Sequence, residues 1–161
     1  MLVLALISAL VVADTTAGNP HLFAGLAGTW SCSTAAGSSV IQRYSVAPNG
    51  DVTERIDWTN PRMSGGSGDQ VFSYDASSGA WSVKNTGSIG LIFTGTIRDV
   101  DGNVADIVGT QTDGKTTVPT RERFIFESPS FFSHVWEVQG SDGGWRPISY
   151  AECSLAETVR Q

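Results

Sequence analysis

Residues 26–33 are LAGTWSCS and residues 149–154 are SYAECS, and these two stretches hold the only two cysteines of the 161-residue chain. Neither cysteine has a partner at the close spacing of a zinc or thiol-redox motif. In an oxidising compartment the simplest interpretation is one disulfide, Cys32–Cys153, whereas in the cytosol both would be free thiols. A bridge between these stretches predicts a fold in which the first and the last elements are neighbours.

The composition favours a globular β protein. The chain has 18 glycines, five tryptophans and seven phenylalanines, and only 16% of its residues are charged. Many glycines suit tight turns, and the aromatic side chains supply a core, which argues against disorder. The net charge is −6, and no cluster of Lys and Arg follows the pattern that binds phosphates, so we expect no nucleic-acid partner.

The sequence opens with an apolar run, MLVLALISALVVA, at residues 1–13. This run has the length of the apolar part of a signal peptide and is short for a membrane-spanning helix. No Lys or Arg precedes it, so an uncleaved anchor or a buried first strand are the alternatives. We expect residues 1–17 to be a signal peptide and residues 18–161 to be a single domain, secreted or periplasmic, without a membrane span in its mature form.

Turn signals recur every eight to twelve residues from Gly28 onward, which is typical of antiparallel β-structure. Asn49-Gly50 is the strongest of several hairpin signals. Before them, residues 21–28 have the spacing of one or two helical turns with Leu22, Phe23 and Leu26 on the apolar side. Ten short-looped strands form a meander, and a disulfide between the first and last strands requires that meander to close. The predicted fold is all-β: an antiparallel up-and-down barrel of about ten strands, with a short N-terminal helical turn.

Alternation along each strand indicates which side chains face the interior of this barrel. A ten-stranded barrel encloses more space than a tight core fills, and an apolar lining suits a small hydrophobic ligand. A few polar residues fall on the same inward faces as the aromatic ones. The predicted cavity lining is Gln42, Tyr44, Glu54, Ile56, Trp58, Phe93, Phe124, Phe126, His134 and Trp136.

No catalytic, phosphate-binding or metal-binding motif is present in the sequence. One enzymatic alternative places Glu54 and His134 in the cavity as acid and base, with Tyr44 positioning an apolar substrate. Such a barrel would be an isomerase, a cyclase or a hydrolase. The competing interpretation pairs Glu54 with Arg43 or Arg55 at the surface and makes His134 a core residue. Arg121 and Arg123 are expected on a solvated strand face.

The stretch Gly28-Thr29-Trp30 resembles the G-x-W signature on the first strand of lipocalin-like (calycin) barrels. Residues 74–81 and 142–153 are similar to segments of secreted bacterial lipocalin-like domains of unknown function. The resemblance implies that Trp30 plugs the closed end of the barrel, under a basic side chain such as Arg146 or Arg160. It implies a ten-stranded barrel of the fatty-acid-binding or nitrobindin type, and it implies no reaction.

Nitrobindin-like barrels hold haem through a histidine near the C-terminus, and His134 is the candidate here. Their fuller G-x-W-x-G-x-G pattern is absent, because Cys32 and Thr34 occupy its last two glycine positions. We therefore expect no haem, other cofactor or metal. The sequence predicts a secreted barrel that binds a small apolar, lipid-like ligand without catalysis, as a monomer or weak dimer. A barrel enzyme and a haem protein are the alternative functions.

Overall fold

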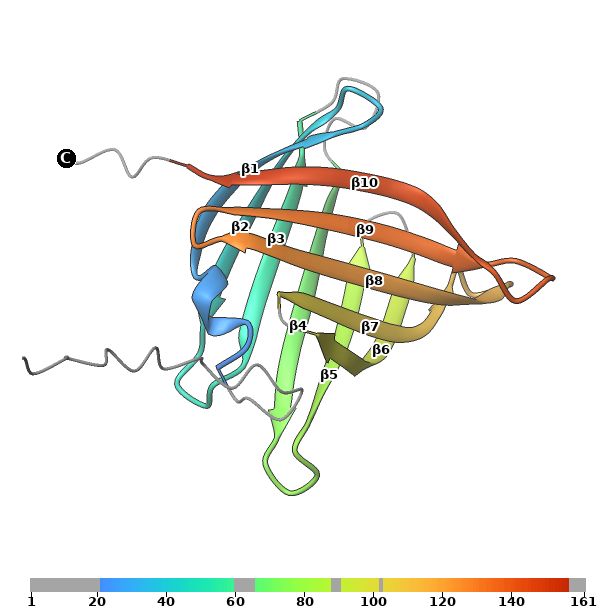
Figure 1. Ribbon diagram of the computed structural model, residues 1–161, viewed down its shortest axis with the longest axis horizontal. Helices are drawn as coiled ribbons and strands as arrows, with labels where there is room; N and C mark the ends of the chain where they lie inside the picture. The colour runs from blue at the N-terminus through green and yellow to red at the C-terminus, as the bar shows by residue number, and fades with distance from the viewer. Residues whose placement is uncertain (1–20, 60–65, 88–90, 102, 157–161) are drawn as a thin grey trace, which may run out of the picture.

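Ten antiparallel strands follow one another around a closed barrel in the computed structural model, which describes residues 21–59, 66–87, 91–101 and 103–156 (Figure 1). A short 3-10 turn, η1 (Ala24–Leu26), precedes them. Each strand pairs with its neighbours in sequence, and β1 also pairs with β10. The predicted fold class is confirmed. The strands are β1 (Gly28–Thr34), β2 (Ser39–Val46), β3 (Val52–Trp58), β4 (Ser67–Asp75), β5 (Ala80–Gly87), β6 (Ile92–Asp101), β7 (Val104–Thr112), β8 (Thr117–Ser128), β9 (Phe131–Gln139) and β10 (Trp145–Leu155).

The turn residues of the sequence explain where the hairpins bend. Gly50 between β2 and β3 has φ of +89°, and Gly143 between β9 and β10 has φ of +80°. A residue with a side chain is strained at a left-handed φ, whereas glycine adopts it without strain. Because each connection reverses the chain, η1 and the β2–β3, β4–β5, β6–β7 and β8–β9 connections lie at one end of the barrel, the closed end. The β1–β2, β7–β8 and β9–β10 connections lie at the opposite end, the open end (Figure 1).

Phe23, which directly precedes η1, fills the closed end of the barrel. Its side chain is fully buried, and its ring centroid lies 4.4 Å from that of Phe72, 5.4 Å from Trp81 and 5.7 Å from Phe124. The contacts with Trp81 and Phe124 are edge-to-face, and such contacts add to the gain from burying apolar area. The segment that the sequence predicted as a helical turn is therefore part of the core.

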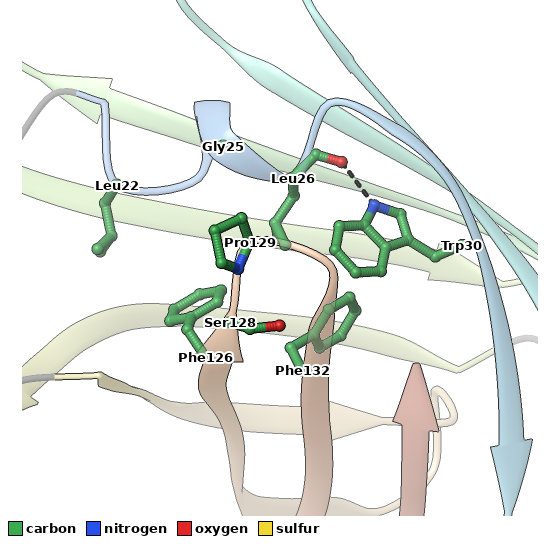
Figure 2. A pocket seen from close by; sticks show the side chains of 8 residues that line it. All are labelled: Leu22, Gly25, Leu26, Trp30, Phe126, Ser128, Pro129 and Phe132. Atoms are coloured by element: carbon green, nitrogen blue, oxygen red, sulfur yellow. Dashed lines mark hydrogen bonds between the residues drawn. The ribbon is translucent and has the colours of Figure 1, made fainter. Parts of the chain in front are cut away.

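Trp30 on β1 also lies at the closed end, as the family resemblance implies. Its indole N–H donates a hydrogen bond of 2.7 Å to the carbonyl oxygen of Leu26, and its ring packs edge-on against Phe132 at 4.8 Å (Figure 2). The hydrogen bond satisfies the polar atom of a residue that is only 2% exposed. η1 is thereby fixed over the end of the barrel.

Of the two basic side chains expected over Trp30, Arg146 is excluded. Trp30 pairs with Leu155 at the end of β10, whereas Arg146 lies near its beginning, roughly 30 Å away along the strand. Arg146 instead forms an ion pair of 3.0 Å with Asp142 in the β9–β10 turn. Arg160, the other candidate, lies outside the described residues.

Cys32 and Cys153 form a disulfide, as predicted. The two residues are direct partners in the register of β1 with β10, and 121 positions separate them in sequence. The bridge thus joins the two strands whose pairing closes the barrel. Within the described ranges no helix has the length and apolar character needed to cross a membrane.

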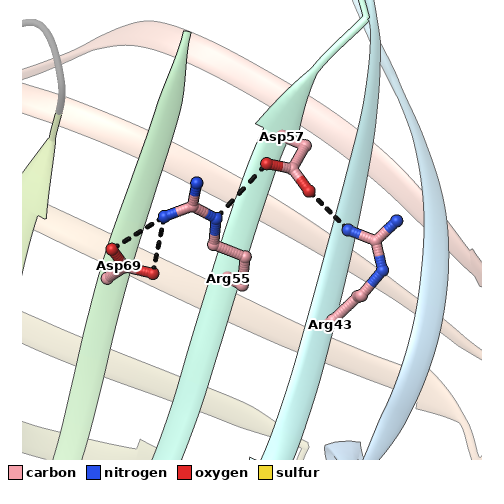
Figure 3. A network of polar contacts seen from close by, with 4 residues as sticks. All are labelled: Arg43, Arg55, Asp57 and Asp69. Carbon is pink, nitrogen blue, oxygen red and sulfur yellow. Dashed lines mark hydrogen bonds and ion pairs between the residues drawn. The ribbon is translucent and has the colours of Figure 1, made fainter. Parts of the chain in front are cut away.

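Arginine and aspartate side chains pair on the outer face of β2, β3 and β4 (Figure 3). Arg43 contacts Asp57, and Arg55 lies 3.3 Å from Asp57 and 2.8 Å from Asp69. Such exposed pairs contribute little to stability, because water screens them. The arginines are thus engaged by aspartates outside the barrel, so the surface pairing that one interpretation assigned to Glu54 is wrong.

Arg121 and Arg123 of β8 also lie on the outer face, as predicted. Arg121 donates to Glu137 over 2.6 Å, and Arg123 donates to Asp106 over 2.7 Å. The guanidinium of Arg121 lies 4.8 Å above the ring of Trp145, which adds a cation–π contact. Because successive side chains of a strand point to opposite faces, Glu122, which lies between these two arginines, points into the barrel.

Candidate functional site

A cavity of about 280 Å³ occupies the interior near the open end of the barrel. Its apolar lining comes from several strands and from Leu91 before β6, and its polar lining is mostly amide and imidazole. The apolar lining residues are Val40, Ile56, Trp58, Leu91, Trp136, Ile148 and Ala151, and the polar ones are Thr34, Gln42, Asn85, Gln111, His134 and Ser149.

The structure divides the predicted cavity lining into three groups. Gln42, Ile56, Trp58, His134 and Trp136 line the cavity. Tyr44, Glu54 and Phe93 are buried inside the barrel behind that lining. The third group, Phe124 and Phe126, lies further away.

Phe124 and Phe126 belong to the aromatic cluster of the closed end, where their rings stack at 6.2 Å. Phe126 also lines a separate apolar hollow of about 220 Å³ beneath η1, with Leu22 and Pro129 on its other sides (Figure 2). The interior is therefore layered: aromatic rings lie at the closed end, polar groups in the middle, and the cavity towards the open end.

A chain of hydrogen bonds crosses the polar layer. Asn85 Nδ2 donates to Gln70 Oε1 over 2.9 Å, and Gln70 Nε2 donates to Glu122 Oε2 over 2.8 Å. His134 Nε2 lies 3.8 Å from the same carboxylate oxygen. The chain joins β5, β4, β8 and β9, so it fixes the carboxylate of Glu122 beside His134 at the edge of the cavity.

Glu54 is the second carboxylate of the polar layer. It lies opposite Tyr44 in the β2–β3 register and is only 2% exposed. Neither of its oxygens makes a well-aligned hydrogen bond to a described residue. The nearby hydroxyl of Tyr44 donates to Gln42 Oε1 over 3.3 Å. Burial raises the pKa of Glu54 to about 7; His134 and the nearby hydroxyl of Tyr44 oppose this rise, and Glu122 adds to it. Burial, together with the charge of Glu54, also raises the pKa of Tyr44 well above its ordinary value.

Three members of the polar layer were missed by the sequence prediction: Gln70, Asn85 and Glu122. A signal for each was present, because period-two alternation from Phe72, Val83 and Phe124 places these residues on the inward face. Glu122 lies between Arg121 and Arg123 in the sequence, and three consecutive charged residues are typical of an exposed strand, so the alternation was overlooked here. The contact between Gln70 and Glu122 spans 52 positions, and no local pattern predicts it.

The polar groups around the cavity can bind a polar ligand atom but do not form a metal site. Among the described residues, no group of three or more His, Cys, Asp and Glu side chains has the arrangement to hold a metal ion. Several buried polar atoms lack a hydrogen-bond partner within this part of the chain: both carboxylate oxygens of Glu54, Oε1 of Glu122, Oε1 of Gln111, Nε2 of His134 and Nε1 of Trp136. A bound molecule with hydrogen-bonding groups could satisfy some of them.

The residues around His134 do not fit a haem. Its ring is stacked on Phe124 at 4.4 Å, and its Nε2 faces Glu122. The cavity of about 280 Å³ is also below the range of roughly 300–1,000 Å³ usual for pockets that hold drug-sized ligands. A proximal histidine would need its ring clear of such stacking and its nitrogen facing a wider space.

The fold and the cavity define a class of protein: a closed ten-stranded antiparallel barrel with an interior cavity open at one end, consistent with a lipocalin-like barrel. No protein-family model matches the chain, and the search of curated proteins gives no significant match.

Proposed function

We propose that the protein is a secreted, lipocalin-like barrel that binds a small hydrophobic ligand and does not transform it. The observation that carries the proposal is the cavity itself, in which Trp58, Trp136 and Ile148 face a few polar groups. Pockets for small molecules combine an apolar lining with a small number of orienting polar groups in this way. The disulfide supports an oxidising compartment, outside the cell or in a periplasm.

The size of the cavity favours a compact ligand. About 280 Å³ is available inside, and a hollow of about 470 Å³ at the rim shares Thr34, Trp58, Ile148 and Ser149 with the cavity. A longer molecule could place its head inside and its tail along this rim. Entry would then take place past Trp58 and Ile148 at the open end.

Fluorescence titration with the neutral probe N-phenyl-1-naphthylamine tests the proposal. The unmodified protein should show saturable enhancement. Ala151→Phe should abolish it, because Ala151 lines the cavity and is only 7% exposed, so the new ring would fill the space. Ser154→Phe on the exposed side of β10 is the matched control. Equal binding by both variants, or no saturable binding by the unmodified protein, would contradict binding in the cavity.

A second candidate function is catalysis by Glu54 and His134, and the raised pKa of Glu54 favours it. Acid–base catalysis is most effective when the pKa lies near the working pH. However, His134 lines the cavity while Glu54 lies behind the lining, so a substrate in the cavity meets only His134 directly. Native mass spectrometry of the purified protein, followed by incubation with the recovered ligand, separates the two functions. A ligand whose mass changes with the unmodified protein but not with Glu54→Gln would support the enzyme.

A further inference from the structure

The charged groups inside the barrel are mainly acidic. Glu54 and Glu122 are 2% and 0% exposed, and they project inward from β3 and β8 on opposite sides of the interior. The Lys and Arg side chains that the structure describes, among them Arg43, Arg121 and Arg123, lie on the outer surface or in exposed turns. The only cationic group near the carboxylates in this part of the chain is therefore His134, when it is protonated.

Both carboxylates lie directly next to the lining of the cavity. Glu122 is the cross-strand partner of Trp136, and Trp136 lines the cavity. Ile56, another lining residue, is the next inward-facing residue after Glu54 on β3. Two residues along a strand span about 7 Å, so Glu54 lies about 7 Å from Ile56, towards the closed end. A polar group at the deep end of the cavity is therefore within one layer of side chains of both carboxylates.

The carboxylates are not fully satisfied by the protein. Both oxygens of Glu54 and Oε1 of Glu122 lack hydrogen bonds to any described residue, and Gln111 Oε1, at the cavity surface, lacks one as well. All of these atoms are acceptors. Buried carboxylates are normally paired with a cation or hydrogen-bonded. These acceptors would therefore be satisfied by a hydrogen-bond donor, and best by one that carries a positive charge.

We propose that the cavity selects a compact apolar ligand whose polar end is a protonated amine, and that it discriminates against ligands ending in a carboxylate. This inference rests on the proposed binding function and specifies its ligand class. An ammonium group carries the positive charge that the two carboxylates behind the lining favour, and an N–H donor for Gln111 Oε1 at the cavity surface. A carboxylate head would lie within one layer of side chains of two buried acids, and the unpaired indole N–H of Trp136 at the lining would offset only part of its desolvation.

Calorimetric titration with three ligands that share one apolar body tests the inference: 4-phenylbutylamine, 4-phenylbutanol and 4-phenylbutyrate. At pH 8 the amine should bind at least tenfold more tightly than the alcohol, and the carboxylate should bind weakest. Glu54→Gln and Glu122→Gln preserve side-chain shape, and each should reduce amine affinity about tenfold while leaving alcohol affinity unchanged. Glu127→Gln, at an exposed glutamate on the outer surface, is the matched control and should change neither.

The outcomes separate the ligand class from the binding function. If the alcohol binds but the amine has no advantage, or if neither buried glutamate affects the ratio of the two affinities, the inference is wrong and the binding function stands. Tighter binding of the carboxylate would also overturn it. If none of the three ligands binds and the neutral naphthylamine probe also fails, both the binding function and the inference fail. Circular dichroism of each variant establishes that the barrel is intact before titration.

Discussion

Cys32 and Cys153 are direct partners across β1 and β10, so the disulfide joins the two strands that close the barrel. With 121 positions between them, the chain-entropy estimate for such a loop is about 5 kcal/mol. The double variant Cys32→Ala and Cys153→Ala should lose up to this amount of unfolding free energy in urea titrations. Mass analysis without reductant should find the unmodified protein lighter by two hydrogens than its reduced form. An unchanged unfolding midpoint would contradict a stabilising bridge.

Glu54 makes stability depend on pH. Burial raises its pKa from the ordinary value of 4.5, which applies to the unfolded chain, to about 7 in the folded protein. Between these values the folded state holds a proton that the unfolded state has released, so stability falls as pH rises from about 4.5 to 7. The expected loss above pH 7 is about 3 kcal/mol, and Tyr44, Glu122 and His134 face the same carboxylate.

Glu54→Gln should remove this loss. Its unfolding free energy should match that of the unmodified protein near pH 4.5 and exceed it by about 3 kcal/mol at pH 8. Urea titrations at four pH values give the difference directly, and Glu127→Gln controls for loss of a surface charge. A difference that is constant with pH would show that Glu54 is not protonated in the folded protein near neutrality.

The sequence was a good predictor of the barrel and a partial predictor of its interior. Alternating apolar residues and turn dipeptides are local features, and they define strands and hairpins directly. The position of Arg146 could not be obtained this way, because it depends on the register between β1 and β10. The hydrogen bond between Gln70 and Glu122 likewise depends on how strands face each other across a closed barrel. The cavity is the space left after those side chains pack, so the sequence predicted only part of its lining.

Gly109 is required by a close approach of β6 and β7. It pairs with Gly95, and a Cβ at position 109 would lie 1.9 Å from the carbonyl oxygen of Thr94 and 2.5 Å from Gly95 Cα. Gly109→Ala should therefore lower the unfolding free energy by about 3 kcal/mol or more, because backbone must move. Gly25→Ala, where a Cβ meets nothing within 4 Å, is the matched control. Thermal unfolding of the two variants should differ clearly; similar midpoints would contradict the tight strand approach.

Phe23 should be as important to stability as a residue of the strands. Its ring is fully buried between Phe72, Trp81 and Phe124, although it lies before the first strand. Phe23→Ala should cost about 3–5 kcal/mol, the range for truncating a buried phenylalanine. Exposed Thr29, near the start of β1, offers a control as Thr29→Ala. If Phe23→Ala unfolds at the same urea concentration as the control, η1 does not contribute to the core.

The pairing of β1 with β10 also has a consequence for self-association. Every other strand pairing in the barrel joins sequence neighbours, while this one joins the two ends of the meander. If it separates, two strands present unpaired N–H and C=O groups, and such edges can recruit strands from other molecules. The disulfide prevents that separation without covering either strand. The disulfide should therefore oppose fibre-like aggregation. Reducing agents should shorten the time over which concentrated protein remains monodisperse.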